Sequence, residues 1–279
     1  MKTLPMFLAG ESVEAADGAT REILNPANNE VLAIVAEGGE RDAARGIDFA
    51  RRAFDDGPWP QMRAAERAAV LFKLADSIEK NADALADIET RNNGKPLREA
   101  KYDVADAAGC FRYYAGLITK PLGQTYEVGD AAIQAMVVRE PIGVCGQIIP
   151  WNYPLLMAAW KLAPGLAAGN CCILKPAETT PLTAIRLFEL IAEAGFPPGS
   201  AQLLLGPGPT CGHALAASLQ VDKIAFTGGT ATGRKIIAAA TGNIKKVTLE
   251  LGGKSPCIVF ADADLDVALE FAKIGRAHV

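Results

Sequence analysis

The sequence has 279 residues, with 28 Lys and Arg against 32 Asp and Glu, so its formal net charge is −4 at pH 7. Half of the residues are hydrophobic and 22% are charged, which excludes a disordered chain and allows one large or two ordinary domains. The acidic balance argues against a nucleic-acid-binding protein, which would carry a basic patch or stripe.

Six cysteines and two histidines suggest neither a disulfide scaffold nor a metal site. Cys171 and Cys172 are adjacent and no CxxC pair occurs, so we expect buried, reduced thiols, including Cys257 in an apolar strand. The apolar stretch at residues 4–9 is too short for a signal peptide, and no run approaches the roughly 18 apolar residues of a membrane helix. We therefore expect a protein of the cytoplasm with no membrane partner.

The first half of the chain predicts short strands followed by helices. Turn-forming clusters such as Asn25-Pro26 divide residues 6–37 into strands, and apolar residues then recur at spacings of three, four and seven. The helices expected here cover residues 40–56, 60–91 and 97–118, the second ending at Asn92-Asn93-Gly94-Lys95-Pro96. Residues 1–122 are thus expected to be scaffold. Residues 123–141 are expected to form a β-hairpin that leaves the main body and belongs to the oligomerisation region, where subunits contact one another.

After Pro141, apolar strands alternate with helices. The expected strands cover residues 142–149, 171–174, 202–205, 223–226, 246–249 and 257–260. The expected helices cover residues 154–168, with a kink or break at Pro164, then 180–195 with Thr180 as N-cap, 209–218, 230–240 and a last helix capped by Asp264. Nearly continuously apolar strands in this alternation predict an α/β fold with a parallel sheet covered by helices on both faces.

Residues suited to ligand binding follow five of these strands. The segments at the strand ends are 150–154, 175–178, 206–209, 226–230 and 250–254, which combine Gly and Pro with Trp, Asn, Lys and Glu. Ligands of parallel sheets bind outside the carboxyl ends of the strands, so five such strand ends in succession predict a ligand-binding site there. The glycine fingerprint GxGxxG is absent. Gly228 and Gly233 have the separation of a P-loop, but the lysine is displaced by one position and no Ser or Thr follows it.

Six segments, taken in order and at their spacing, resemble the NAD(P)-dependent aldehyde dehydrogenase superfamily over nearly the whole chain. They are residues 139–144 (REPIGV), 150–154 (PWNYP), 169–170 (GN), 175–178 (KPAE), 226–229 (FTGG) and 249–256 (LELGGKSP). Residues 154–161 (PLLMAAWK) resemble the betaine-aldehyde and aminoaldehyde branch. The resemblance implies that residues 142–273 form a Rossmann-like NAD-binding region.

The resemblance also implies a reaction, the oxidation of an aldehyde to a carboxylic acid with NAD as cofactor. A cysteine thiolate would attack the aldehyde to give a thiohemiacetal and then a thioester, which water hydrolyses. Asn152 matches the family's donor to the oxyanion, where one hydrogen bond is typically worth roughly 10²–10³ in rate. Glu250 matches the general base, a role that suits a carboxylate in a partly apolar cleft because burial raises its pKa. The expected substrate is betaine aldehyde or an aminoaldehyde.

The remaining matches would hold the cofactor. Lys175 would contact a ribose, and Glu178 would bind the adenosine ribose hydroxyls and repel a 2′-phosphate, so NAD is expected in preference to NADP. The helix after Gly229, where many family members carry Ser, would receive the pyrophosphate at its N-terminus. The full set of expected cofactor-binding residues is Ile148, Pro150, Trp151, Asn152, Lys175, Glu178, Gly208, Phe226, Thr227, Gly228, Gly229, Glu250, Leu251 and Gly252.

The match ends near residues 273–275, whereas family members continue for roughly two hundred residues, a typical domain length. The nucleophilic cysteine would lie beyond Val279, so we expect this chain to be an inactive N-terminal fragment, with residues 274–279 a foreign or truncated tail. The full-length parent would be a homodimer or homotetramer. Two alternatives stay open: a non-catalytic NAD-binding or assembly module, and a P-loop nucleotidase that hydrolyses ATP with magnesium.

Overall fold

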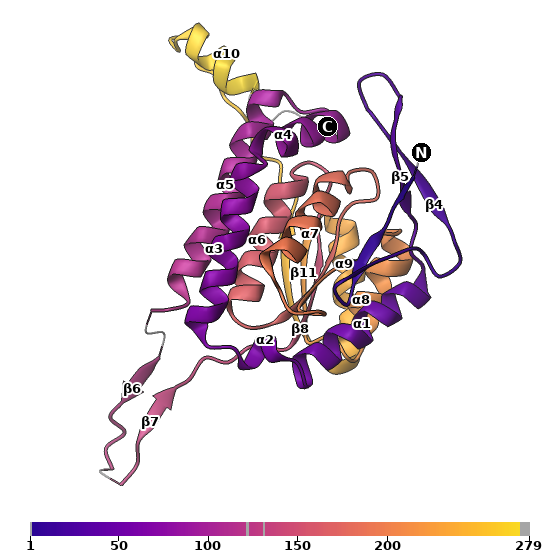
Figure 1. Ribbon diagram of the computed structural model, residues 1–279. Coiled ribbons are helices and arrows are strands. Elements are labelled where there is room, and N and C mark those ends of the chain that lie inside the picture. The colour runs from indigo at the N-terminus through magenta and orange to yellow at the C-terminus, as the bar shows by residue number, and fades with distance from the viewer. Residues whose placement is uncertain (1, 121–122, 131, 274–279) are drawn as a thin grey trace.

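The computed structural model describes residues 2–120, 123–130 and 132–273 (Figure 1). Its centre is a seven-stranded sheet in the order β12-β11-β8-β9-β10-β2-β3. The strands are β2 (Met6–Leu8), β3 (Glu11–Val13), β8 (Val144–Ile148), β9 (Cys171–Lys175), β10 (Ala201–Leu203), β11 (Lys223–Gly228) and β12 (Lys246–Leu251). The five strands from β12 to β10 are parallel, and β2 and β3 extend the sheet antiparallel at β10. The predicted parallel α/β sheet is confirmed.

Helices cover both faces of this sheet, as predicted. On one face lie α6 (Pro154–Ala167) and α7 (Leu182–Ala194), and on the other lie α1 (Glu40–Asp55), α8 (His213–Ala217) and α9 (Thr230–Ala239). A second helical layer packs outside α6 and α7; it comprises α3 (Ala64–Lys80), α4 (Ala82–Asn93) and α5 (Leu97–Leu117). Three short helical segments connect the longer elements. They are α2 (Pro58–Gln61), the π-helical η1 (Gly208–Gly212) and the 3₁₀-helical η2 (Ala240–Asn243).

Two smaller sheets lie beside this body. The first, in the order β1-β5-β4, comprises β1 (Thr3–Leu4), β4 (Thr20–Leu24) and β5 (Val31–Ala36). The second is the predicted hairpin of β6 (Gln124–Tyr126) and β7 (Ala135–Val137), which points away from the layered body in Figure 1. Its role in subunit contacts stays a prediction, and so do the domain boundaries placed at residues 122, 141 and 273.

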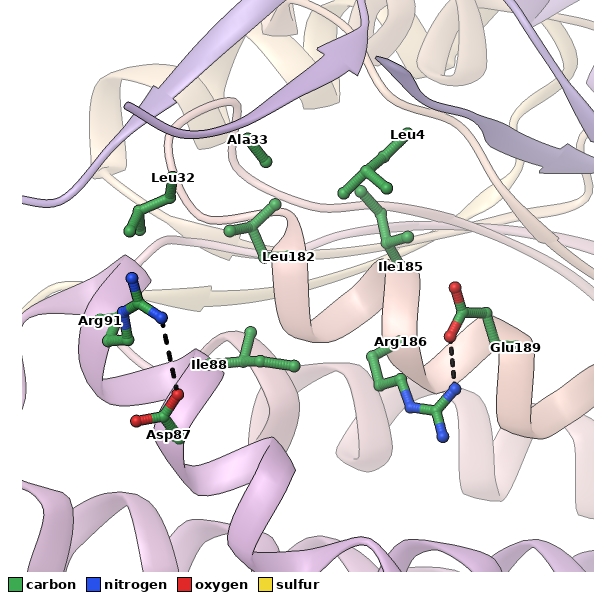
Figure 2. Close-up of a pocket in the computed structure, with 10 residues that line it drawn as sticks. All are labelled: Leu4, Leu32, Ala33, Asp87, Ile88, Arg91, Leu182, Ile185, Arg186 and Glu189. Carbon is green, nitrogen blue, oxygen red and sulfur yellow. Dashed lines mark hydrogen bonds and ion pairs between the residues drawn. The ribbon is translucent and has the colours of Figure 1, made fainter. Parts of the chain in front are cut away.

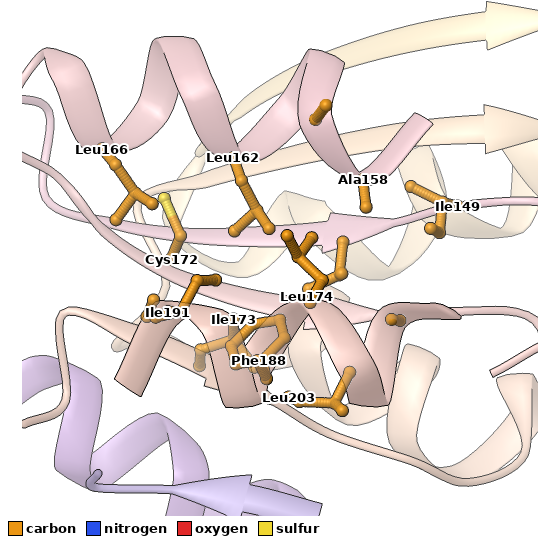
Figure 3. Close-up of a cluster of buried hydrophobic side chains, with 14 of the residues drawn as sticks. Ile149, Ala158, Leu162, Leu166, Cys172, Ile173, Leu174, Phe188, Ile191 and Leu203 are labelled. Carbon is orange, nitrogen blue, oxygen red and sulfur yellow. The ribbon is translucent and has the colours of Figure 1, made fainter. Parts of the chain in front are cut away.

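The core is densest around β9. Figure 3 shows Leu162 and Leu166 of α6 above Cys172, and Phe188 and Ile191 of α7 beside Ile173. All these side chains are at most 1% exposed. Burial of apolar area on this scale is the dominant stabilising contribution to folding. The sheet is thereby fixed with the carboxyl ends of its parallel strands along one rim.

Three helix predictions need correction. The helix expected over residues 60–91 is divided into α2, α3 and α4. The backbone is extended at Met62 and Arg63, between α2 and α3, and it leaves helical geometry again at Asn81 (φ −103°, ψ +16°), between α3 and α4. Pro164 does not break α6, since Leu162 and Leu166 on either side of it are fully buried and outweigh one missing hydrogen bond. Thr180 does not cap α7: its hydroxyl is buried without a partner among the described residues, and Asn92 accepts a hydrogen bond from the N–H of Leu182 instead (3.1 Å).

The strand expected over residues 257–260 is also wrong. No strand of the described chain pairs with this segment, so its apolar side chains are not covered, and Phe260 is 72% exposed. Cys257 is therefore exposed rather than buried, whereas Cys145, Cys171, Cys172 and Cys211 are buried as expected. The last helix, α10 (Leu265–Lys273), begins as predicted, with the Asp264 carboxylate accepting hydrogen bonds from the N–H groups of residues 266 and 267. The tail over residues 274–279 lies outside the described residues.

Candidate functional site

A large cavity opens at the carboxyl rim of the central sheet. Its volume is about 850 Å³, and it lies between the ends of β8, β9, β11 and β12 and the helices α8 and α9. All fourteen residues named from the sequence line it: Ile148, Pro150, Trp151, Asn152, Lys175, Glu178, Gly208, Phe226, Thr227, Gly228, Gly229, Glu250, Leu251 and Gly252. The structure thus brings together residues that are up to 104 positions apart in the chain (148 to 252).

The strand register explains this convergence. Ile148 pairs with Lys175 across β8 and β9 and with Phe226 across β8 and β11, while Thr227 pairs with Glu250 across β11 and β12. Parallel strands in register end at the same edge, so the residues that follow them face a common space.

One wall of the cavity is built around Lys175 and Glu178. The Lys175 ammonium is 2% exposed, donates to the Pro176 carbonyl at 2.8 Å and lies 3.5 Å from the Glu178 carboxylate. Burial lowers the pKa of Lys175. Burial opposes ionisation of Glu178 as well, but the Lys175 charge and hydrogen bonds from backbone N–H groups, including that of Gly208, outweigh it, so the pKa of Glu178 lies below its ordinary value. The wall therefore presents an ionised carboxylate that can accept hydrogen bonds from hydroxyl groups.

A second part of the wall, at the ends of β8 and β12, carries Trp151, Asn152 and Glu250. The Asn152 side-chain oxygen is buried and has no hydrogen-bond partner among the described residues. The Trp151 carbonyl accepts a hydrogen bond from the Asn93 amide at 2.6 Å. Glu250 lines this partly apolar cavity but is exposed, so the burial that the sequence interpretation assumed for this carboxylate is not observed. The Lys161 ammonium is attracted by Glu250, yet burial dominates and lowers the pKa of Lys161 to about 8.

The N-terminus of α9 forms the floor at the end of β11. The backbone is extended at Gly229, the residue before the helix, and Thr227, Gly228 and Gly229 line the cavity. The first N–H groups of a helix have no partner within the helix and, with the helix dipole, favour an anion such as a phosphate. The buried Thr227 hydroxyl has no partner in the described chain and adds a polar group to this floor.

Nine lining residues were not in the expected cofactor-binding set, although two of them, Ala177 and Pro209, lie in the strand-end segments singled out from the sequence. The nine are Ile149, Ala177, Pro209, Gly212, His213, Thr232, Lys235, Ile236 and Ala239. Four of them share one face of α9, and their spacing of three and four would have indicated this face once the helix was placed at the cavity. None of the six cysteines lines the cavity, and the described residues contain no cluster of three His, Cys, Asp or Glu suited to a metal ion.

A second, smaller cavity of about 260 Å³ lies between β5, α4 and α7 (Figure 2). Leu32, Leu182 and Ile185 form its apolar part, and its charged residues pair with one another. Arg91 lies 3.9 Å from Asp87, and Arg186 lies 2.5 Å from Glu189. This cavity shares no lining residue with the large one.

Comparison with known sequences decides the family. The aldehyde dehydrogenase family profile matches residues 13–276. This chain belongs to the aldehyde dehydrogenase family. The betaine aldehyde dehydrogenase of Bacillus subtilis is 51% identical over 267 residues, which are 96% of this chain and 54% of that protein. Aldehyde dehydrogenase family 2 member B4 of Arabidopsis thaliana is also 51% identical, over 96% of this chain and 50% of that protein.

Solved structures agree with this aldehyde dehydrogenase assignment. A crystal structure of betaine aldehyde dehydrogenase from Staphylococcus aureus in complex with NAD⁺ superposes with a TM-score of 0.92 at 44% identity, covering 96% of this chain and 53% of that one. The chain thus spans about half the length of the relatives it matches, all of it within their N-terminal part. None of the described helices combines the length and apolar character needed to cross a membrane.

Proposed function

We propose that this chain is the NAD-binding part of an aldehyde dehydrogenase. The full-length enzyme that contains it oxidises an aldehyde to a carboxylic acid. The convergence of all fourteen expected residues on one cavity is the observation that supports this most directly. The cavity also has the polar groups for a dinucleotide: a helix N-terminus for the pyrophosphate, an ionised Glu178 for ribose hydroxyls, and the unpartnered Thr227 hydroxyl.

Each residue has a role in this proposal. NAD supplies the acceptor for the hydride that leaves the substrate. Glu178 and Lys175 hold the adenosine ribose and orient the cofactor along the rim. The Asn152 amide donates to the oxygen of the substrate as it becomes negative, and Glu250 accepts a proton from water. Betaine aldehyde or an aminoaldehyde is the proposed substrate class, supported by the betaine aldehyde dehydrogenases among the relatives.

Titration calorimetry with NAD⁺ on the 279-residue chain tests the binding step. We expect saturable one-to-one binding, because the groups that would contact the cofactor come from this chain. Absence of heat with NAD⁺ would remove the basis of the proposal. Magnesium-dependent ATP hydrolysis, which the P-loop alternative requires, should not be observed.

A non-catalytic binding module remains the second candidate. It is favoured by the observation that no cysteine lines the cavity in the described part of the chain. NAD⁺ binding without aldehyde oxidation by any longer protein that carries this sequence would support it. Three expectations stay predictions. They are that the 279-residue chain alone does not oxidise aldehyde, that the enzyme acts as a dimer or tetramer, and that it works in the cytoplasm.

Replacing Glu178 with Gln should relax the choice between NAD⁺ and NADP⁺. The ionised carboxylate would repel a 2′-phosphate, and removal of one like charge at close range should improve NADP⁺ affinity relative to NAD⁺ about tenfold. Dissociation constants for both cofactors measure this ratio. Glu189→Gln removes a carboxylate at the separate small cavity and should leave the ratio unchanged; an equal response in both variants would refute the role of Glu178.

A further inference from the structure

Residues 89–95, the last turn of α4 and the turn that follows it, contact the two segments that follow β8 and β9, and both segments supply residues that line the large cavity. From the sequence, this segment is expected only to end a helix. In the structure four of its side chains contact the chain that follows β8 or β9: Glu89, Asn92, Asn93 and Lys95. We call residues 89–95 the brace.

The brace contacts the segment after β8 through three side chains. The Asn93 amide donates to the Trp151 carbonyl at 2.6 Å, which belongs to the peptide group joining Trp151 to Asn152. The Lys95 ammonium lies 4.4 Å from the centre of the Tyr153 ring. The Glu89 carboxylate accepts a long hydrogen bond of 3.5 Å from the N–H of Leu155 in the first turn of α6. The backbone on both sides of Asn152 is therefore held from α4.

Contacts with the segment after β9 come from Asn92 and Glu89. The Asn92 amide donates to the Thr179 carbonyl at 2.9 Å, and its oxygen accepts from the N–H of Leu182 at 3.1 Å. The Glu89 carboxylate accepts from the Thr183 hydroxyl at 2.7 Å. Thr179 directly follows Glu178, so these bonds fix the chain immediately after the carboxylate of the cavity wall.

The brace is largely buried and is held by contacts of its own. Glu89, Asn92 and Lys95 are at most 4% exposed. The Lys95 ammonium pairs with Glu89 at 3.3 Å and with Asp103 of α5. Gly94 adopts a left-handed conformation (φ +87°), and its N–H donates to the Thr90 carbonyl at 2.8 Å, which lets the chain turn directly between Asn93 and Lys95.

We propose that the brace positions the two walls of the nucleotide site, with Asn93 setting the peptide before Asn152 and Asn92 setting the chain after Glu178. This inference rests on the proposed function. Neither asparagine lines the cavity, so both are positioning residues. Their effects should separate, because Asn152 belongs to the nicotinamide end of the proposed site and Glu178 to the adenosine end.

Binding of two nucleotides to the 279-residue chain tests this separation. Asn93→Ala and the isosteric Asn93→Asp, which cannot donate to the carbonyl, should weaken NAD⁺ binding about fivefold and AMP binding less than about twofold. Asn92→Ala should weaken both nucleotides by about the same factor, since AMP contains the adenosine ribose. Asn243→Ala removes an amide that also donates to main-chain carbonyls, those of Leu219 and Val221, and should change neither.

Hydrogen exchange of the ligand-free chain supplies a readout that does not depend on NAD. Amides of residues 151–153 and 155 should exchange at least about threefold faster in Asn93→Ala than in the wild type, and at the wild-type rate in Asn243→Ala. Unchanged exchange, or equal weakening of AMP and NAD⁺ by Asn93→Ala, would overturn the role assigned to Asn93. If the wild-type chain binds neither nucleotide, the proposed function fails, and the exchange rates still decide whether the brace holds this segment.

Discussion

Replacing Lys95 with Met should lower the free energy of unfolding by about 3–5 kcal/mol, the range found when one partner of a buried ion pair is removed. Lys95 is 4% exposed and provides the positive charge next to the buried carboxylates of Glu89 and Asp103. Met keeps the unbranched apolar stem of the side chain, one heavy atom shorter, but leaves both carboxylates without this charge. Urea unfolding followed by circular dichroism measures the loss.

An exposed ion pair provides the matched control. Lys101 lies 3.0 Å from Asp83, and both side chains are mostly exposed, so Lys101→Met should cost less than about 1 kcal/mol. Similar losses in the two variants would mean that the buried cluster contributes no more than a surface pair, contrary to this expectation.

The destabilisation by Lys95→Met should also depend on pH. Burial raises the pKa of Glu89 and of Asp103, and the Lys95 charge opposes this rise. A carboxyl group whose pKa is higher in the folded than in the unfolded state destabilises the fold as the pH rises through the interval between the two values. Without Lys95 this interval widens, so the difference between variant and wild type should be larger at about pH 7.5 than at about pH 5.5. If the difference in unfolding free energy between variant and wild type grew as the pH fell, Lys95 would not be the group that stabilises the ionised forms of Glu89 and Asp103.

The residues at the strand ends could be predicted from the sequence because a local pattern determines them. Parallel strands must end at one edge, so the identity of each strand was enough to bring Asn152, Lys175 and Glu250 to one cavity. The exposure of Glu250 could not be predicted from strand positions, because it depends on which other segments cover the end of β12. Cys257 shows the same limit: an apolar run predicts a strand, but a strand also needs a hydrogen-bonded neighbour.

The brace was not predictable from local patterns. Asn92 and Asn93 are typical residues for the end of a helix, and nothing in the sequence indicates partners 58 to 90 positions away, namely Trp151 and Leu182. Thr180 shows the opposite case, in which a local pattern predicts a contact that does not form. The sequence predicts Thr180 as the cap of α7, but Asn92 of α4 accepts the hydrogen bond at the start of this helix instead. The packing of α4 against α6 and α7 decides both cases, and only the fold supplies it.

Asn152→Ala should lower the rate of aldehyde oxidation by about 10²–10³, the typical effect of removing one hydrogen-bond donor to a developing oxyanion. The assay requires a protein that also supplies a nucleophilic cysteine. We suggest joining this chain to the second half of the Bacillus subtilis betaine aldehyde dehydrogenase, because the two sequences are 51% identical over 267 residues. Stopped-flow measurement of NADH formation then gives the rate constant directly.

The kinetic pattern distinguishes a catalytic from a binding role for Asn152. A donor that acts on the oxyanion contributes mainly in the transition state, so kcat and kcat/KM should fall together while the KM for NAD⁺ changes little. Asn28→Ala, at an exposed turn remote from the cavity in sequence and absent from its lining, should leave both constants unchanged. A rise in the KM for NAD⁺ with an unchanged kcat would instead assign the Asn152 side chain to cofactor binding alone, because only uniform binding would then have been lost.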